Sequence, residues 1–138
     1  MQSSSRRRST RRQRVRRRNA SLISLTIGTL QIRAELEQHA AAREFKNLLP
    51  LSLAMEDYVG KEKIGFLPQK LATQGMQPYD GEAVGDLAYY APWGNIAIFY
   101  RPYRFSRGLV RLGHLLDPLE PLLIDHPFTL TIKAELAA

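Results

Sequence analysis

Residues 22–36 read LISLTIGTLQIRAEL, and this stretch decides the fold class. Around a central Gly28-Thr29 pair, apolar side chains recur at every second position, which is typical of strands with one buried face. A glycine at the first position of a two-residue connection favours a tight hairpin turn. The stretch therefore predicts two antiparallel strands, whose alternating apolar positions are Ile23, Leu25 and Ile27, then Leu30, Ile32, Ala34 and Leu36.

The segment that follows changes its period. Ala41, Phe45, Leu48 and Leu49 recur at helical spacing, so we expect a helix over about residues 40–49, ended by Pro50. Alternating or β-rich runs then predict further short strands, with a glycine-rich loop over residues 72–85. These runs begin at Leu51 and Glu62 and continue at residues 86–90, 95–100, about 109–115 and 128–136.

This pattern indicates a mostly β domain with one clear helix. Many short strands separated by turns are typical of a sandwich or a closed barrel. We favour a barrel because closure leaves no long exposed strand edge.

The strong positive charge of the chain is confined to its first residues. The formal net charge is +7, yet nine arginines lie within residues 1–20 without one acidic residue. From residue 21 onward, eleven basic residues face thirteen acidic ones, which gives a formal charge of −2. We expect residues 1–20 to form a disordered arm that attracts polyanions such as nucleic acid, ahead of a domain over residues 21–138. The candidate polyanion-binding residues are Arg6, Arg7, Arg8, Arg11, Arg12, Arg14, Arg16, Arg17 and Arg18.

Composition excludes several kinds of chemistry. The chain has no cysteine, so disulfides, thiol catalysis and cysteine-ligated metals are ruled out. His39, His114 and His126 have no metal-ligand spacing, and no glycine-rich phosphate loop is present. No apolar run reaches the roughly 18 residues that a membrane-spanning helix needs. We expect a cytoplasmic protein with no metal, no cofactor and no membrane association.

Four later segments carry a family resemblance. In order, LLPLSLAMED, KEKIGFLPQKL, VGDLAYYAPWGNIAIFY and SRGLVRLGHL resemble the small bacterial cyclophilin-like family, and the similarity covers roughly residues 21–136. The resemblance implies a closed eight-stranded β-barrel with a helix packed on it. It implies little about activity, because most members of that family are uncharacterised.

Prolyl isomerase activity is not supported by the residues. True cyclophilins carry a Phe-His-Arg segment followed by Phe-Met-x-Gln-Gly-Gly-Asp, and neither string occurs here. Arg101 and Arg104 lie near aromatic residues, but in a different arrangement. We therefore expect a non-enzymatic module that binds a small molecule or peptide. The alternatives are an isomerase-like or other unrecognised enzyme, and a nucleic-acid-associated protein that acts through its arm.

Four residues are candidates for ligand binding, and no catalytic residue is assigned. Glu62 shares a strand face with Ile64, where an apolar surrounding could shift its pKa; a solvated position, or pairing with a neighbouring lysine, is the alternative. Trp93 and Tyr100 belong to an aromatic-rich stretch that indicates either a pocket near a barrel mouth or ordinary packing. Arg104 is the candidate contact for an anionic ligand, within a basic cluster that also includes Arg101, Arg107 and Arg111.

Overall fold

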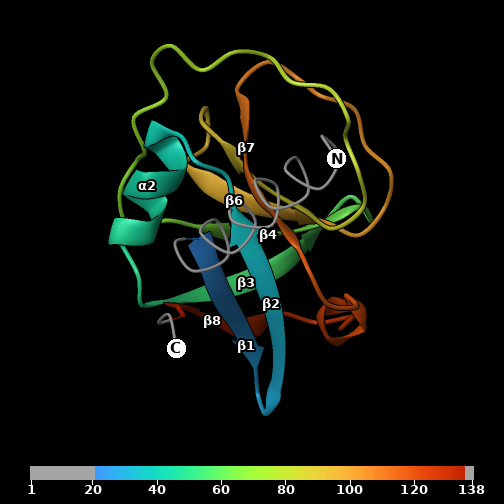
Figure 1. Cartoon of the computed structure of the whole chain (residues 1–138). Coiled ribbons are helices and arrows are strands. Elements are labelled where there is room, and N and C mark those ends of the chain that lie inside the picture. Colours follow the sequence, from blue (N-terminus) through green and yellow to red (C-terminus); the bar gives the residue numbers. More distant parts are fainter. Residues whose placement is uncertain (1–20, 136–138) are drawn as a thin grey trace, which may run out of the picture.

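The computed structural model describes residues 21–135, which form a closed antiparallel β-barrel (Figure 1). Neighbouring strands follow the order β1-β2-β7-β5-β6-β4-β3-β8, and β8 returns to β1. The eight strands are β1 (Leu22–Ile27), β2 (Leu30–Leu36), β3 (Leu51–Tyr58), β4 (Glu62–Phe66), β5 (Asp86–Tyr90), β6 (Asn95–Phe99), β7 (Leu109–Leu115) and β8 (Phe128–Ala134). The mostly β, closed-barrel prediction is confirmed.

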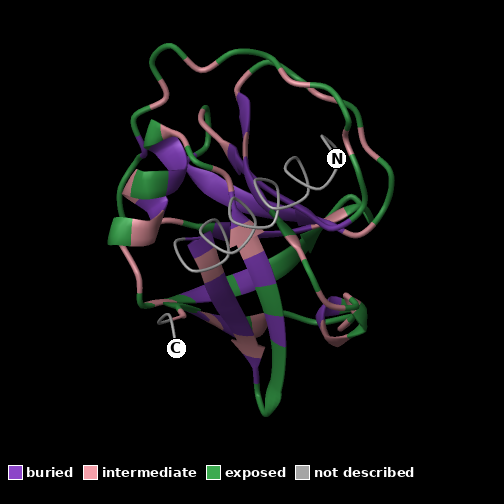
Figure 2. Cartoon of the chain, in the orientation of Figure 1, coloured by how far each residue is buried: buried purple, intermediate pink, exposed green. Residues whose placement is uncertain are grey.

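The β1–β2 hairpin forms as its alternation predicts, except that Leu30, next to the turn, is exposed rather than buried. Leu25 pairs with Ile32, and the two-residue turn is possible because Gly28 adopts a φ of 60°. Along β2, buried and exposed residues alternate (Figure 2), so one face enters the barrel and the other meets solvent.

The helix α2 (Ala40–Asn47) is shorter than predicted by two residues. Leu48 caps its end, because the residue before a proline disfavours helical geometry and Leu49 precedes Pro50. At the other end, the His39 ring accepts from the Ala42 amide at 3.1 Å and contacts the Arg111 carbonyl at 2.8 Å. Through this histidine the helix is tied to β7.

The barrel interior is filled by a single apolar cluster to which every strand except β4 contributes. The helix adds Ala41, Ala42 and Phe45 to this cluster, so it covers one end of the barrel. A 3-10 turn (Glu120–Leu122), which the sequence pattern did not predict, adds the buried Leu122.

A second apolar cluster lies on the outer wall. On β6, Ile96 and Ile98 belong to the interior cluster, whereas Ala97 and Phe99 belong to the outer one. Because successive side chains of a strand point to opposite faces, the two clusters lie on either side of the same wall. The wall of β4, β6, β5 and β7 is therefore buried on both faces, and its outer cluster forms the base of the site described next.

Residues 21–135 contain no helix with the length and apolarity needed to cross a membrane. The predicted disordered arm, with its nine arginines, lies outside the described residues.

Candidate functional site

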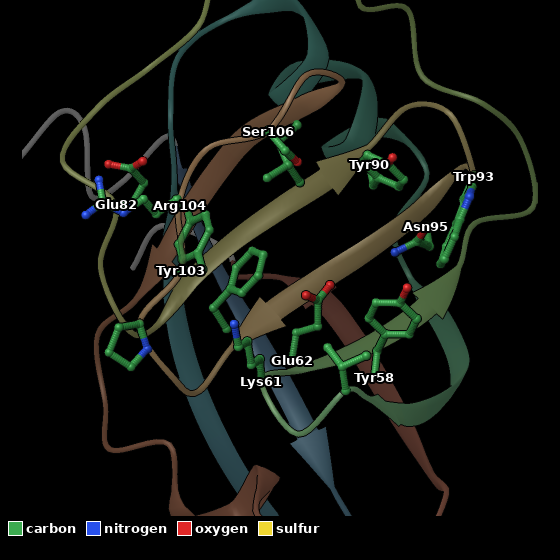
Figure 3. Close-up of a pocket in the computed structure, with 14 residues that line it drawn as sticks. Tyr58, Lys61, Glu62, Glu82, Tyr90, Trp93, Asn95, Tyr103, Arg104 and Ser106 are labelled. Carbon is green, nitrogen blue, oxygen red and sulfur yellow. The ribbon is translucent and has the colours of Figure 1, made fainter.

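A pocket of about 750 Å³ lies on the outer wall of the barrel, over β4, β6 and β5 (Figure 3). Loop residues from 82 and from 102–106 form one side, and residues from the β3–β4 and β5–β6 connections form the other. It is lined by Tyr58, Val59, Lys61, Glu62, Glu82, Tyr90, Trp93, Asn95, Phe99, Pro102, Tyr103, Arg104, Ser106 and Leu109.

Glu62 opens β4 and points into this pocket (Figure 3). Its direct cross-strand partners are Tyr58 on one side and Phe99 on the other, so aromatic residues flank the carboxylate in the sheet. The resulting burial raises the pKa of Glu62; Lys61 opposes this effect, and Asp57 adds to it. Among residues 21–135, no side chain or amide bonds to the Glu62 carboxylate.

Lys63, the residue after Glu62, does not pair with the Glu62 carboxylate. Lys63 points to the opposite face of β4, where its ammonium is buried and donates to the Ile124 carbonyl at 2.6 Å. It also lies 3.4 Å from the Asp57 carboxylate. The Glu62 carboxylate thus faces the pocket without a contact to Lys63, whereas Lys61 acts on it electrostatically from the pocket lining.

Three aromatic rings form one side of the pocket. Trp93 meets Tyr58 edge-on, with ring centroids 5.4 Å apart, and meets Tyr90 at 5.5 Å in a similar geometry. Such T-shaped contacts are a preferred arrangement of aromatic pairs. Trp93 keeps 48% of its surface exposed, so this aromatic group is both held in place and open to a ligand.

Asn95, at the same end of the pocket, has an unusual polar atom buried beneath the pocket surface. The residue is 1% exposed, and its side-chain amide donates to the Ile96 carbonyl at 3.1 Å. Its Oδ1 is buried and accepts no hydrogen bond from any group in residues 21–135. A buried acceptor without a donor is costly, and such groups are uncommon in folded proteins.

The opposite side of the pocket is built from two clamped loops. Tyr103 stacks on Phe99, with ring centroids 3.6 Å apart, and donates its hydroxyl to Asp86 at 2.7 Å. The Phe105 amide donates to Glu82 at 2.7 Å, which lowers the pKa of that carboxyl. These contacts hold residues 82–86 and 102–106 together, so the pocket exists without a ligand to shape it.

Comparison with known families matches residues 25–133 to the family described as "Cyclophilin-like family". The chain belongs to the cyclophilin-like family.

Solved structures agree with this assignment at the level of the fold. The solution structure of a hypothetical protein from Archaeoglobus fulgidus is similar, with a TM-score of 0.66 and 14% identity over 83% of this chain and 95% of that one. The structure of McbB in complex with tryptophan has a TM-score of 0.64 and 11% identity, over 84% of this chain and 45% of that one. None of the curated proteins compared matches the chain.

In this cyclophilin-like protein, three of the four candidate ligand residues come together. Glu62, Trp93 and Arg104 all line the pocket. Tyr100 does not line it; its hydroxyl donates to Asp57, beside the Lys63 ammonium. The pocket also lies on the outer wall rather than near a barrel mouth, because the aromatic residues of β5 and β6 that line it face outward.

Two arginines of the basic cluster have different surroundings, although both act electrostatically on Glu82. Arg111 turns away from the exposed Arg104, donates to Glu37 at 2.7 Å and lies over the Tyr79 ring at 4.6 Å. Residues 21–135 contain no group of three or more His, Asp or Glu side chains that could hold a metal ion.

Asn95 was not a candidate from the sequence. The available signal was its position, because Asn95 is a polar residue on the same strand face as the apolar Ala97 and Phe99. Its place next to Gly94, however, is also typical of a turn.

Proposed function

We propose that the outer-wall pocket binds a small organic molecule or a short peptide and that the protein acts as a binding module. One observation carries the proposal: a pocket of about 750 Å³ brings the Glu62 carboxylate together with the packed rings of Tyr58 and Trp93. Carboxylates and aromatic faces are groups that hold and orient small ligands.

Size and composition support this function. A volume of about 750 Å³ falls within the range of pockets that hold small ligands, roughly 300–1,000 Å³. Such pockets combine aromatic walls with a few polar groups that orient the ligand. Here Tyr58, Tyr90 and Trp93 supply the wall, while Glu62 supplies a polar group. McbB was solved with tryptophan, which makes small aromatic molecules sensible first probes for a barrel of this fold.

The chain contains a built-in reporter for testing this function. Trp93 is its single tryptophan, so all intrinsic tryptophan fluorescence comes from the pocket. We expect aromatic amines, amides and acids from a fragment library to include members that change this fluorescence in a saturable manner. Mass spectrometry of the native protein would identify any ligand that co-purifies with it.

The matched variants are Tyr58→Ala, which opens the aromatic wall, and Leu30→Ala, which removes an exposed side chain at the β1–β2 hairpin. Tyr58→Ala should weaken binding of any hit, and Leu30→Ala should leave it unchanged. Equal affinity in both variants, or no saturable hit together with no co-purified ligand, would refute the pocket as the binding site.

A further inference from the structure

The carboxylate of Glu62 gives the pocket a chemical preference. It is half-buried, and Tyr58 and Phe99 are its partners on the two adjacent strands. Both aromatic faces and carboxylates attract an organic cation, the faces through their ring quadrupole and the carboxylate through its charge. In Figure 3 the Glu62 carboxylate and the Tyr58 ring are both directed into the pocket, with Trp93 beyond them.

The other charged groups of the pocket leave this preference in place. On the side of the pocket opposite Glu62, the Arg104 charge helps to lower the pKa of Glu82. These two opposite charges therefore offset one another. Lys61 also lines the pocket, and its charge partly offsets that of Glu62, but its side chain is exposed to solvent whereas the Glu62 carboxylate is half-buried beside the aromatic residues. Glu62 is therefore the charge that a ligand would meet between the aromatic residues.

Asn95 adds no second point of recognition that a ligand reaches directly. Its Oδ1 has no donor in residues 21–135, but the residue is 1% exposed and the atom is covered by protein. Recognition is therefore assigned to Glu62 and to the aromatic side of the pocket.

Building on the proposed function, we propose that the ligand is an organic cation with an aromatic body. Its ammonium group pairs with Glu62 beside Tyr58, and its body packs against Trp93. An alkyl amine that carries an aromatic group has this chemistry.

Three probes of equal length test the charge preference in the full chain. They are N-(5-aminopentyl)benzamide, its neutral analogue N-(5-hydroxypentyl)benzamide and the anionic 5-benzamidopentanoate, each titrated while Trp93 fluorescence is recorded. We expect the amine to bind about tenfold more tightly than the alcohol, the gain of one charge-assisted hydrogen bond, and more tightly still than the carboxylate.

Two isosteric variants test whether Glu62 causes the preference for the amine over the alcohol. Glu62→Gln should reduce the preference for amine over alcohol to less than about threefold while the alcohol still binds. Glu56→Gln removes the same charge from an exposed residue of β3 that does not line the pocket, and it should leave the tenfold preference intact.

Each other outcome overturns the inference. If the alcohol or the carboxylate binds the wild-type chain as tightly as the amine, the cationic class is wrong, although the pocket remains a binding site. If none of the three probes changes Trp93 fluorescence, the class is again wrong, and the fragment and mass-spectrometry tests decide separately whether the pocket binds anything.

Discussion

Replacing Asn95 by leucine should make the protein more stable. Leucine has nearly the shape of asparagine but carries no polar atom, and position 95 is 1% exposed. The substitution removes the buried Oδ1 that has no donor, and it also removes the bond from the side-chain amide to the Ile96 carbonyl.

The two effects have opposite signs and unequal sizes. Removing an unsatisfied buried acceptor recovers about 1–3 kcal/mol, whereas losing one ordinary hydrogen bond costs about 0.5–1.5 kcal/mol. The net change in the free energy of unfolding is therefore a gain of about 1 kcal/mol for Asn95→Leu. For a chain of this length, that gain raises the Tm by about 4 °C.

Urea and thermal unfolding, followed by circular dichroism, measure this change, and Tyr103→Phe provides the contrast. The Tyr103 hydroxyl is satisfied by Asp86 and Tyr79, at 2.7 and 2.9 Å, so its removal should cost about 1.5–3 kcal/mol. If Asn95→Leu destabilises the barrel as much as Tyr103→Phe does, Oδ1 has a hydrogen-bond donor in solution, and the argument that it is unsatisfied fails.

Three further predictions concern the barrel, the carboxylate and the arm. Gly113→Ala should destabilise the protein by about 3 kcal/mol in urea unfolding, because the new methyl group would overlap backbone atoms of Glu35 and Leu36. In the control Gly65→Ala, the methyl group meets the flexible Met55 side chain and should cost about 1 kcal/mol, so equal costs would contradict the argument. Glu62→Gln should be more stable than wild type at pH 7, because a carboxyl whose pKa is raised in the folded state loses folding stability as pH rises through that pKa. The difference in Tm between the two proteins should close as pH drops below the ordinary glutamate pKa of 4.5. A Tm difference that does not change with pH would contradict the raised pKa. Deleting residues 1–20 should abolish salt-sensitive binding to heparin or DNA, because the remaining chain carries a formal charge of −2. Fluorescence anisotropy measures this binding, and unchanged binding would exclude residues 1–20 as the polyanion site.

Local patterns in the sequence were sufficient to predict the strands and the helix. Alternation over residues 22–36 specifies which face of the hairpin is buried, and Pro50 marks where the helix must end. The same local logic placed Glu62 on the face of Ile64, which the register of β4 with β6 confirms.

Contacts between distant strands could not be predicted in this way. Tyr100 was grouped with Trp93 by proximity in the chain, yet it bonds to Asp57, 43 positions away. Arg111 was grouped with Arg104, but the β2–β7 pairing brings it to Glu37. The missing donor of Asn95 Oδ1 depends on the whole surrounding wall, so no local pattern could reveal it.

The two-sided wall also separates two evolutionary pressures. On β6, Ile96 and Ile98 are constrained by the packed interior, whereas residues of the outer face, such as Phe99, line the pocket and would be constrained by the ligand under the proposed function. Substitutions at every second position can then alter specificity while the fold keeps its stability. A lineage that duplicates such a gene could diversify its ligands by small steps, and a protein engineer could follow the same route without redesigning the core.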